Sequence, residues 1–178
     1  MLIKVEGDDY TKCVEAAKNY WASSKKGNYG RGLINSEGDP TKVERTGLLG
    51  EMAFSIFSGL PVDFSYKKGG DKTDFILNGM TIDVKTAASN YGANCIKAYT
   101  ASGKYVFREL DVYVAAYVQE DNGEFAIVNL VGYELGKNIK EYPVKGARAR
   151  GLHKNFELDH KKLKPIENLT VTATIKSV

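Results

Sequence analysis

The chain has 178 residues, of which 43% are hydrophobic and 26% are charged, a balance typical of one soluble globular domain with a sizeable core. The formal net charge of +3 permits a polyanionic partner but does not require one. Two distant cysteines, Cys13 and Cys95, fit no metal or redox spacing, and no segment resembles a membrane span or a signal peptide. We therefore expect a reduced, cytosolic protein that forms a single domain over residues 1–178.

The spacing of apolar residues predicts helices and strands along most of the chain. A first helix is expected over residues 8–22, followed by a polar, glycine-rich loop over residues 23–39. A second helix should begin after Asp39, a good N-cap, and end at Gly59. Further elements are strands at residues 62–66, 111–119 and 125–131, an irregular crossover with one short strand at most over residues 87–104, and a short helix over residues 133–139.

The second helix contains two glycines, Gly47 and Gly50, at interior positions. Each glycine costs about 1 kcal/mol of helix stability relative to alanine, so a packing reason is expected. Close approach of this helix to a sheet would supply that reason. Glu51 follows Gly50 and borders the apolar stripe of the helix, from which its carboxylate could reach over the edge of the sheet.

A tight hairpin is predicted where Asn78-Gly79 separates two apolar runs, because both central residues of a type I′ turn need positive φ. With a two-residue turn, Leu77 faces Met80, and counting outward places Asp74 opposite Asp83. Lys85 lies two residues beyond Asp83 and points to the same face. Facing carboxylates repel each other, so a cation is expected beside them.

Metal-assisted hydrolysis of a phosphodiester is the chemistry that these residues support. Glu51, Asp74 and Asp83 would supply oxygen ligands for Mg²⁺ or Mn²⁺. The backbone carbonyl of Val84 could also lie near the metal. A metal-bound water is a stronger acid than bulk water and can become the nucleophile. Lys85 could make that water more acidic, orient it, or stabilise the transition state.

The same residues carry a resemblance to the PD-(D/E)XK, or restriction-endonuclease-like, nuclease superfamily. The chain has Gly-Leu-Leu-Gly-Glu on a predicted helix, Asp74 on a strand, and Asp83-Val84-Lys85-Thr86 on the next strand. It resembles most closely the small, mostly phage-encoded members, over about residues 40–131. The resemblance implies an α/β fold with a mixed central β-sheet flanked by helices and an αβββαβ core. It also implies that Asp74, Asp83, Lys85 and Glu51 are the catalytic residues, with cleavage in the host cytoplasm if the chain is phage-encoded.

Two features depart from the superfamily pattern. Thr73 stands where the motif has proline, and no helical period follows the Asp83 strand in residues 87–104. Asp71 is a rival to Asp74 for the metal. Asp74 is preferred because the two-residue turn places it opposite Asp83, whereas Asp71 would fall on the other face.

Basic residues in the glycine-rich loop and near the carboxyl end are candidate contacts to nucleic-acid phosphates. This set consists of Lys25, Lys26, Arg31, Arg148, Arg150 and Lys154. Such contacts are independent of nucleotide sequence and sensitive to salt. For any one of these residues in the glycine-rich loop, a solvated surface position is the more common explanation.

The sequence therefore predicts a metal-dependent endonuclease that cuts DNA, with RNA left open as a substrate. A homodimer that cuts both strands is compatible with a chain of this size. Two alternatives belong to other classes of protein. One is a catalytically inactive nucleic-acid-binding or scaffolding protein that keeps the nuclease fold. The other is a metal- or partner-binding module whose acidic pair is structural.

Overall fold

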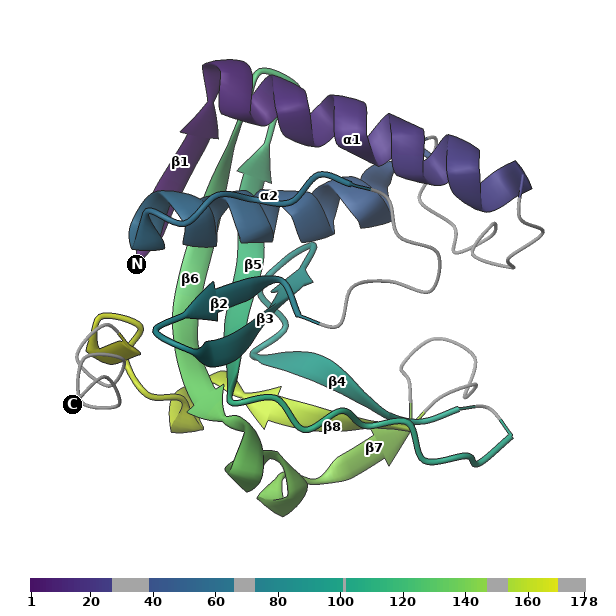
Figure 1. The fold of residues 1–178 in the computed structure, drawn as a ribbon, viewed down its shortest axis with the longest axis vertical. Helices are drawn as coiled ribbons and strands as arrows, with labels where there is room; N and C mark the ends of the chain where they lie inside the picture. Colours follow the sequence, from purple (N-terminus) through teal and green to yellow (C-terminus); the bar gives the residue numbers. More distant parts are fainter. Residues whose placement is uncertain (27–38, 66–72, 101, 147–153, 170–178) are drawn as a thin grey trace.

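The computed structural model describes residues 1–26, 39–65, 73–100, 102–146 and 154–169. It contains two α-helices and eight strands within these residues (Figure 1). In chain order the elements are β1 (Leu2–Glu6), α1 (Gly7–Lys26), α2 (Lys42–Ser58), β2 (Phe75–Leu77), β3 (Met80–Ala87), β4 (Ala93–Tyr99), β5 (Val112–Asp121), β6 (Phe125–Leu135), the 3₁₀ helix η1 (Gly136–Glu141), β7 (Val144–Gly146), β8 (Lys154–Asp159) and the 3₁₀ helix η2 (His160–Lys162). No helix among the described residues has the length and apolar character needed to cross a membrane.

A mixed five-stranded sheet forms the centre of the fold, in the order β1-β6-β5-β3-β2. β3 and β5 are parallel, and the other neighbours in this sheet are antiparallel. The predicted α/β class with a mixed sheet is thereby confirmed. A second sheet has the order β4-β8-β7 and lies at the end of the molecule opposite α1 (Figure 1).

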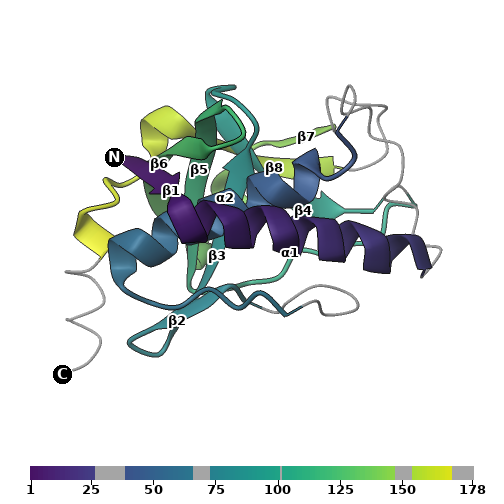
Figure 2. The same cartoon turned by 90° about the horizontal axis from the view of Figure 1, so that it is seen from above.

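The two faces of the central sheet are covered by different parts of the chain. On one face, α1 and α2 bury alternate strand residues such as Ile82, Val84 and Val114, so both helices lie on the same side of the sheet (Figure 2). On the other face, Tyr113 joins a separate apolar cluster with Ile96 of β4. Residues 112–116 are all buried, which confirms the prediction that this strand is covered on both faces.

Local chemistry sets the ends of α2. Gly59 adopts a left-handed conformation with φ of 75°, and its N–H donates to the Ser55 carbonyl, as a glycine C-cap does. At the other end, the helix begins at Lys42 rather than directly after Asp39. The Asp39 carboxylate accepts hydrogen bonds from the Thr41 N–H and hydroxyl and pairs with Arg45, so it fixes the turn before the helix.

The hairpin forms as predicted from Asn78-Gly79. Asn78 has φ of 49° and Gly79 has φ of 76°, which gives the positive φ values of a type I′ turn. Leu77 pairs with Met80, and the register continues to Phe75 and Ile82. The turn therefore contains two residues, and the face of each side chain on β3 follows from the count.

Other expectations need correction. Residues 62–65 form no strand, because Val62 and Phe64 pack against the core without pairing their backbones. The first helix runs to Lys26, so Lys25 and Lys26 belong to α1 rather than to a loop. Between β3 and β5 the described residues contain one strand, β4, as the sequence predicted for this crossover, and not the helix that the resemblance implied there. The short helix expected over residues 133–139 is a 3₁₀ helix that starts at Gly136.

Close contact between α2 and β3 explains one of the two helix glycines. A Cβ atom on Gly50 would lie 1.8 Å from Oγ1 and 2.8 Å from Cβ of Thr86. No atom lies within 4 Å of the corresponding position on Gly47. The helix therefore approaches the sheet at Gly50, as expected, but Gly47 has no such role.

We expect Gly50→Ala to destabilise the protein by about 1–3 kcal/mol, because α2 must move away from Thr86 or strain its contacts. Gly47→Ala is the matched control and should raise stability by up to about 1 kcal/mol, since it gains helix propensity without a clash. Chemical denaturation of both variants beside the wild type measures the two changes. Equal stability of Gly50→Ala and wild type would contradict the packing argument.

The Asp39 carboxylate should stabilise the start of α2 in a pH-dependent way. Partial burial alone would raise its pKa, but hydrogen bonds from Thr41 and the nearby Arg45 guanidinium outweigh burial and lower it. A lowered folded-state pKa gives stability that is present above the ordinary aspartate pKa of about 3.9 and is lost as the pH falls further.

We therefore expect Asp39→Asn to lower the free energy of unfolding at pH 7 by about 1 kcal/mol or less, because the pair is partly exposed. The difference from wild type should shrink progressively in acid as the pH falls below the ordinary aspartate pKa of about 3.9 and the Asp39 carboxylate becomes protonated. Asp9→Asn, which breaks an exposed ion pair with Lys12 on α1, is the control. A difference that persists unchanged into acid would show that the charge of Asp39 is not responsible.

Candidate functional site

Strand β3 presents Asp83 and Lys85 on the face turned away from the two helices. Ile82 and Val84 point into the core under α1 and α2, and successive side chains on a strand alternate between faces. Asp83 pairs in the parallel ladder with Tyr113, whose side chain lies in the cluster beneath the second sheet. The parity predicted for Asp83 and Lys85 from the hairpin turn is therefore present.

The Asp83 carboxylate and the Lys85 ammonium form an ion pair. The Asp83 side chain is 15% exposed and that of Lys85 is 36% exposed. The buried Oδ2 atom of Asp83 has this ion pair but no hydrogen bond among the described residues. Burial, and then the negative charge of Asp83, raise the pKa of Tyr113 on the neighbouring strand. Asp83 is thus a charged group in a confined setting that requires a cationic partner.

Asp74 lies at the outer edge of β3, but not in the ladder position that was predicted. The ladder ends at Phe75, and the Asp74 N–H donates instead to the Ile82 carbonyl at 2.9 Å. The Asp74 carboxylate accepts a hydrogen bond from the Val84 N–H at 2.7 Å. The carboxylate therefore lies beside the strand edge at Val84 and takes the place that a partner strand's carbonyl would have.

The backbone of Val84 points toward the same edge. In a strand, the N–H and C=O groups of one residue lie on the same side, so the Val84 carbonyl is directed toward Asp74 together with its N–H. The Val84 carbonyl therefore lies on the Asp74 side of β3, while the Val84 side chain remains in the core.

Glu51 approaches from the helical side of the sheet. It follows Gly50, which contacts Thr86, and its charge is near α1, since burial and then Glu51 raise the pKa of Cys13 to about 12. Among the described residues, no three His, Cys, Asp or Glu side chains are grouped closely enough to hold a metal. Glu51 belongs to α2 on the helical side of β3, Asp83 lies on the opposite face and Asp74 at the strand edge, so the structure does not bring these three predicted ligands together.

Half of the six predicted phosphate contacts lie within the residues that the structure describes. Arg31, Arg148 and Arg150 lie outside the described residues, as does Asp71. Lys25 and Lys26 occupy the last turn of α1. Lys154 is exposed at the start of β8.

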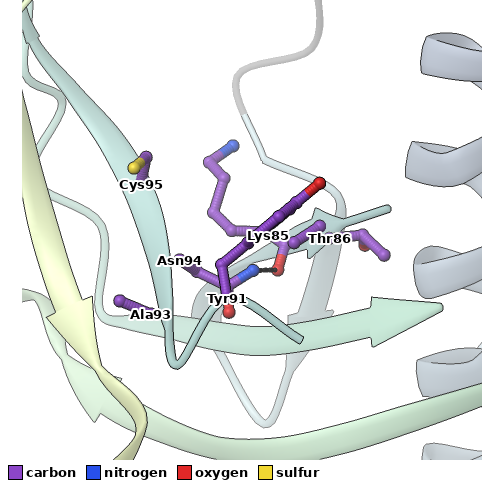
Figure 3. Close-up of a pocket in the computed structure, with 7 residues that line it drawn as sticks. Lys85, Thr86, Tyr91, Ala93, Asn94 and Cys95 are labelled. Atoms are coloured by element: carbon purple, nitrogen blue, oxygen red, sulfur yellow. Dashed lines mark hydrogen bonds between the residues drawn. The ribbon is translucent and has the colours of Figure 1, made fainter. Parts of the chain in front are cut away.

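A pocket next to Lys85 was missed by the sequence reasoning. Its volume is about 190 Å³, and it opens between the end of β3 and the start of β4 (Figure 3). Its lining consists of Lys85, Thr86, Ala87, Tyr91, Ala93, Asn94 and Cys95. Tyr91 is 57% exposed and lies on the turn between the two strands.

Asn94 builds the base of this pocket. Its side-chain amide donates to the carbonyls of Lys85 at 2.6 Å and Ala116 at 2.8 Å, and its Oδ1 lies 2.6 Å from Nε2 of His160. Because Oδ1 can only accept, His160 donates from Nε2. The alternation of β4, which puts Asn94 on the same face as Ile96 and Ala98, was the available signal for a buried polar residue.

We expect Asp74→Ala to destabilise the protein by about 1–3 kcal/mol, because the Val84 N–H loses its acceptor. Asp74→Asn keeps an acceptor oxygen at the same position and should cost clearly less. Denaturant unfolding of both variants checks this difference. Equal losses in the two variants would show that the charge, rather than the hydrogen bond, stabilises this edge.

Comparison with known proteins identifies no relative for this chain. No protein-family model, no curated protein and no solved structure matches it significantly. The functional interpretation therefore depends on the residues and their geometry.

Proposed function

We propose that the protein is a metal-dependent nuclease that hydrolyses DNA phosphodiester bonds. The observation that carries the proposal is the Asp83–Lys85 pair, which combines a confined carboxylate with an adjacent ammonium on one face of β3. Asp74 and the Val84 carbonyl lie along the edge of the same strand. The Asp83 carboxylate is mostly buried and its Oδ2 contacts only the Lys85 ammonium among the described residues, and a carboxylate oxygen is a ligand type that suits a hard divalent cation, Mg²⁺ or Mn²⁺.

Each residue of the pair has a distinct task in this proposal. Asp83 would hold the cation, with Asp74 and the Val84 carbonyl at the neighbouring edge. The Lys85 ammonium has three N–H donors, so it can keep its contact with Asp83 and still donate to a phosphate oxygen. A bound divalent cation would offset the negative charge that develops on the phosphoryl group. Lys85 would orient the phosphate and add positive charge at the same place.

The resemblance to the PD-(D/E)XK superfamily supports this proposal. The support comes more from the residues that match the motif than from the order of helices and strands along the chain. The glycine-flanked Glu51 helix, the Asn-Gly hairpin and the parallel pairing of β3 with β5 are compatible with an αβββαβ core. Where that core has a helix between the last two strands, this chain has β4 in the second sheet. Glu51 remains the proposed third acidic ligand, although the structure does not group its side chain with those of Asp74 and Asp83.

A second candidate function is nucleic-acid binding or scaffolding without catalysis. It is favoured by the direct ion pair between Asp83 and Lys85, because Lys85 alone can neutralise the carboxylate. In such a protein the pair would be structural, and basic residues would bind phosphates without hydrolysis. Cleavage assays on variants of the pair separate the two functions.

With Mg²⁺ or Mn²⁺, we expect the wild type to cut single-stranded or plasmid DNA, and EDTA to abolish cleavage. Asp83→Asn and Lys85→Ala should each lower the rate by about 100-fold or more, since each removes a group that acts on the reacting phosphate. Lys4→Ala is a matched control, because Lys4 forms an ion pair with Glu6 two residues away on β1, at the far edge of the sheet.

Binding of the cation is measured separately from activity. Mn²⁺ should raise the unfolding temperature of the wild type but not that of Asp83→Asn, because a ligand stabilises only the state that binds it. Equal cleavage by all variants would assign the activity to a contaminant or to another site. Loss of cleavage in every sample, with DNA affinity intact, would favour the second candidate.

A further inference from the structure

We infer that the pocket beside Lys85 binds an unpaired nucleotide, with Tyr91 stacking on its base and Lys85 contacting its phosphate. The inference depends on the proposed nuclease function only for the identity of the polymer. It adds Tyr91 as a binding residue. It also specifies the form of the substrate, which is a strand whose base is unstacked where it meets the pocket.

The composition of the pocket fits a nucleotide. Lys85 supplies a cation at one side, and Tyr91 supplies an exposed aromatic ring (Figure 3). The remaining lining residues are small or uncharged, and none of the seven is acidic. A volume of about 190 Å³ is below the range of about 300 Å³ and more that is usual for sites that enclose whole ligands. The pocket is therefore suited to one base or one phosphate group of a longer chain.

Tyr91 is held on a fixed turn. The Asn90 side chain accepts a hydrogen bond from the Gly92 N–H at 3.0 Å, and Gly92 has φ of 75°. The Gly92 carbonyl accepts a hydrogen bond from the His160 N–H at 2.9 Å. Because the turn is tied both within itself and to η2, the backbone that carries Tyr91 needs little ordering before a base can stack on the ring.

Asn94 lies at the bottom of the pocket, but its side chain cannot hydrogen-bond to a nucleotide base. Both hydrogens of its amide are used on the Lys85 and Ala116 carbonyls, and its oxygen contacts His160. It is 3% exposed. Recognition by stacking tolerates any base, because every base has an aromatic face. We therefore expect little preference for nucleotide sequence at this subsite.

Stacking requires a base that is free of its neighbours in a duplex. A single strand, a frayed end or a flap supplies such a base, whereas an intact duplex offers only its phosphates to Lys85. The occupant is thus an unpaired DNA segment, and a matched duplex is the comparison that tests it.

The test measures equilibrium binding in EDTA, so that no cleavage occurs. The probes are an oligothymidylate, an abasic strand of the same length and a matched duplex. Tyr91→Ala should weaken binding of the oligothymidylate by about 5- to 150-fold, the range for loss of one stacked base, and leave binding of the abasic strand unchanged. Tyr91→Phe should bind within about twofold of wild type because it keeps the ring.

Two further variants keep the result interpretable. Tyr91→Leu retains apolar bulk without an aromatic face and should lose affinity like Tyr91→Ala, which guards against an unfolded variant. Tyr105→Ala is the control for an exposed tyrosine outside the pocket, since Tyr105 is 46% exposed and packs beside Tyr99 and Phe107. Its affinity should equal that of the wild type.

The failure of this inference differs from the failure of the proposed function. If Tyr91→Ala binds all three probes as the wild type does, or if the duplex binds best, the inference is overturned, and metal-dependent cleavage that requires Asp83 would still stand. If Tyr91 controls binding of the base-bearing strand but no preparation cleaves DNA, the inference stands and the nuclease function fails.

Discussion

The contact between α2 and β3 at Gly50 and Thr86 is the constraint on which the candidate site depends. Only glycine allows the helix to lie this close, because any side chain at position 50 would occupy the space of Thr86. The contact covers the face of β3 opposite Asp83 and Lys85. The hydroxyl of Thr86 is buried without a hydrogen bond among the described residues, so close packing here outweighs the cost of an unsatisfied polar atom.

The two faces and the two edges of β3 therefore have different neighbours. The helices cover one face, and β5 pairs with one edge in parallel. On the second face the Asp83–Lys85 pair lies near Tyr113 and the pocket at the start of β4. Asn94 ties Lys85 near the end of β3 to Ala116 in the middle of β5, at the point where β4 leaves for the second sheet. The position of Lys85 is therefore fixed from its backbone as well as from its ion pair.

The features that could be predicted from sequence are those set by neighbouring residues. The Asn78-Gly79 turn, the Gly59 cap and the alternation along β3 follow from φ preferences and from the two-residue period of a strand. Features that depend on distant partners were missed. β1 exists because it pairs with β6, and β4 because it pairs with β8 near the carboxyl end. The pocket could not be predicted for the same reason, because Tyr91 and Asn94 line it only when the start of β4 lies beside the end of β3.

Asp74 illustrates how a side chain can act in place of backbone. β2 covers only the first three residues of β3 in the ladder, so the rest of that edge has no partner strand among the described residues. An unpaired strand edge is a template on which another polypeptide can add. The Asp74 carboxylate occupies the Val84 N–H and places a negative charge in the path of an incoming strand. The same residue that is proposed to hold a cation thereby also disfavours the addition of a strand from another copy at this edge.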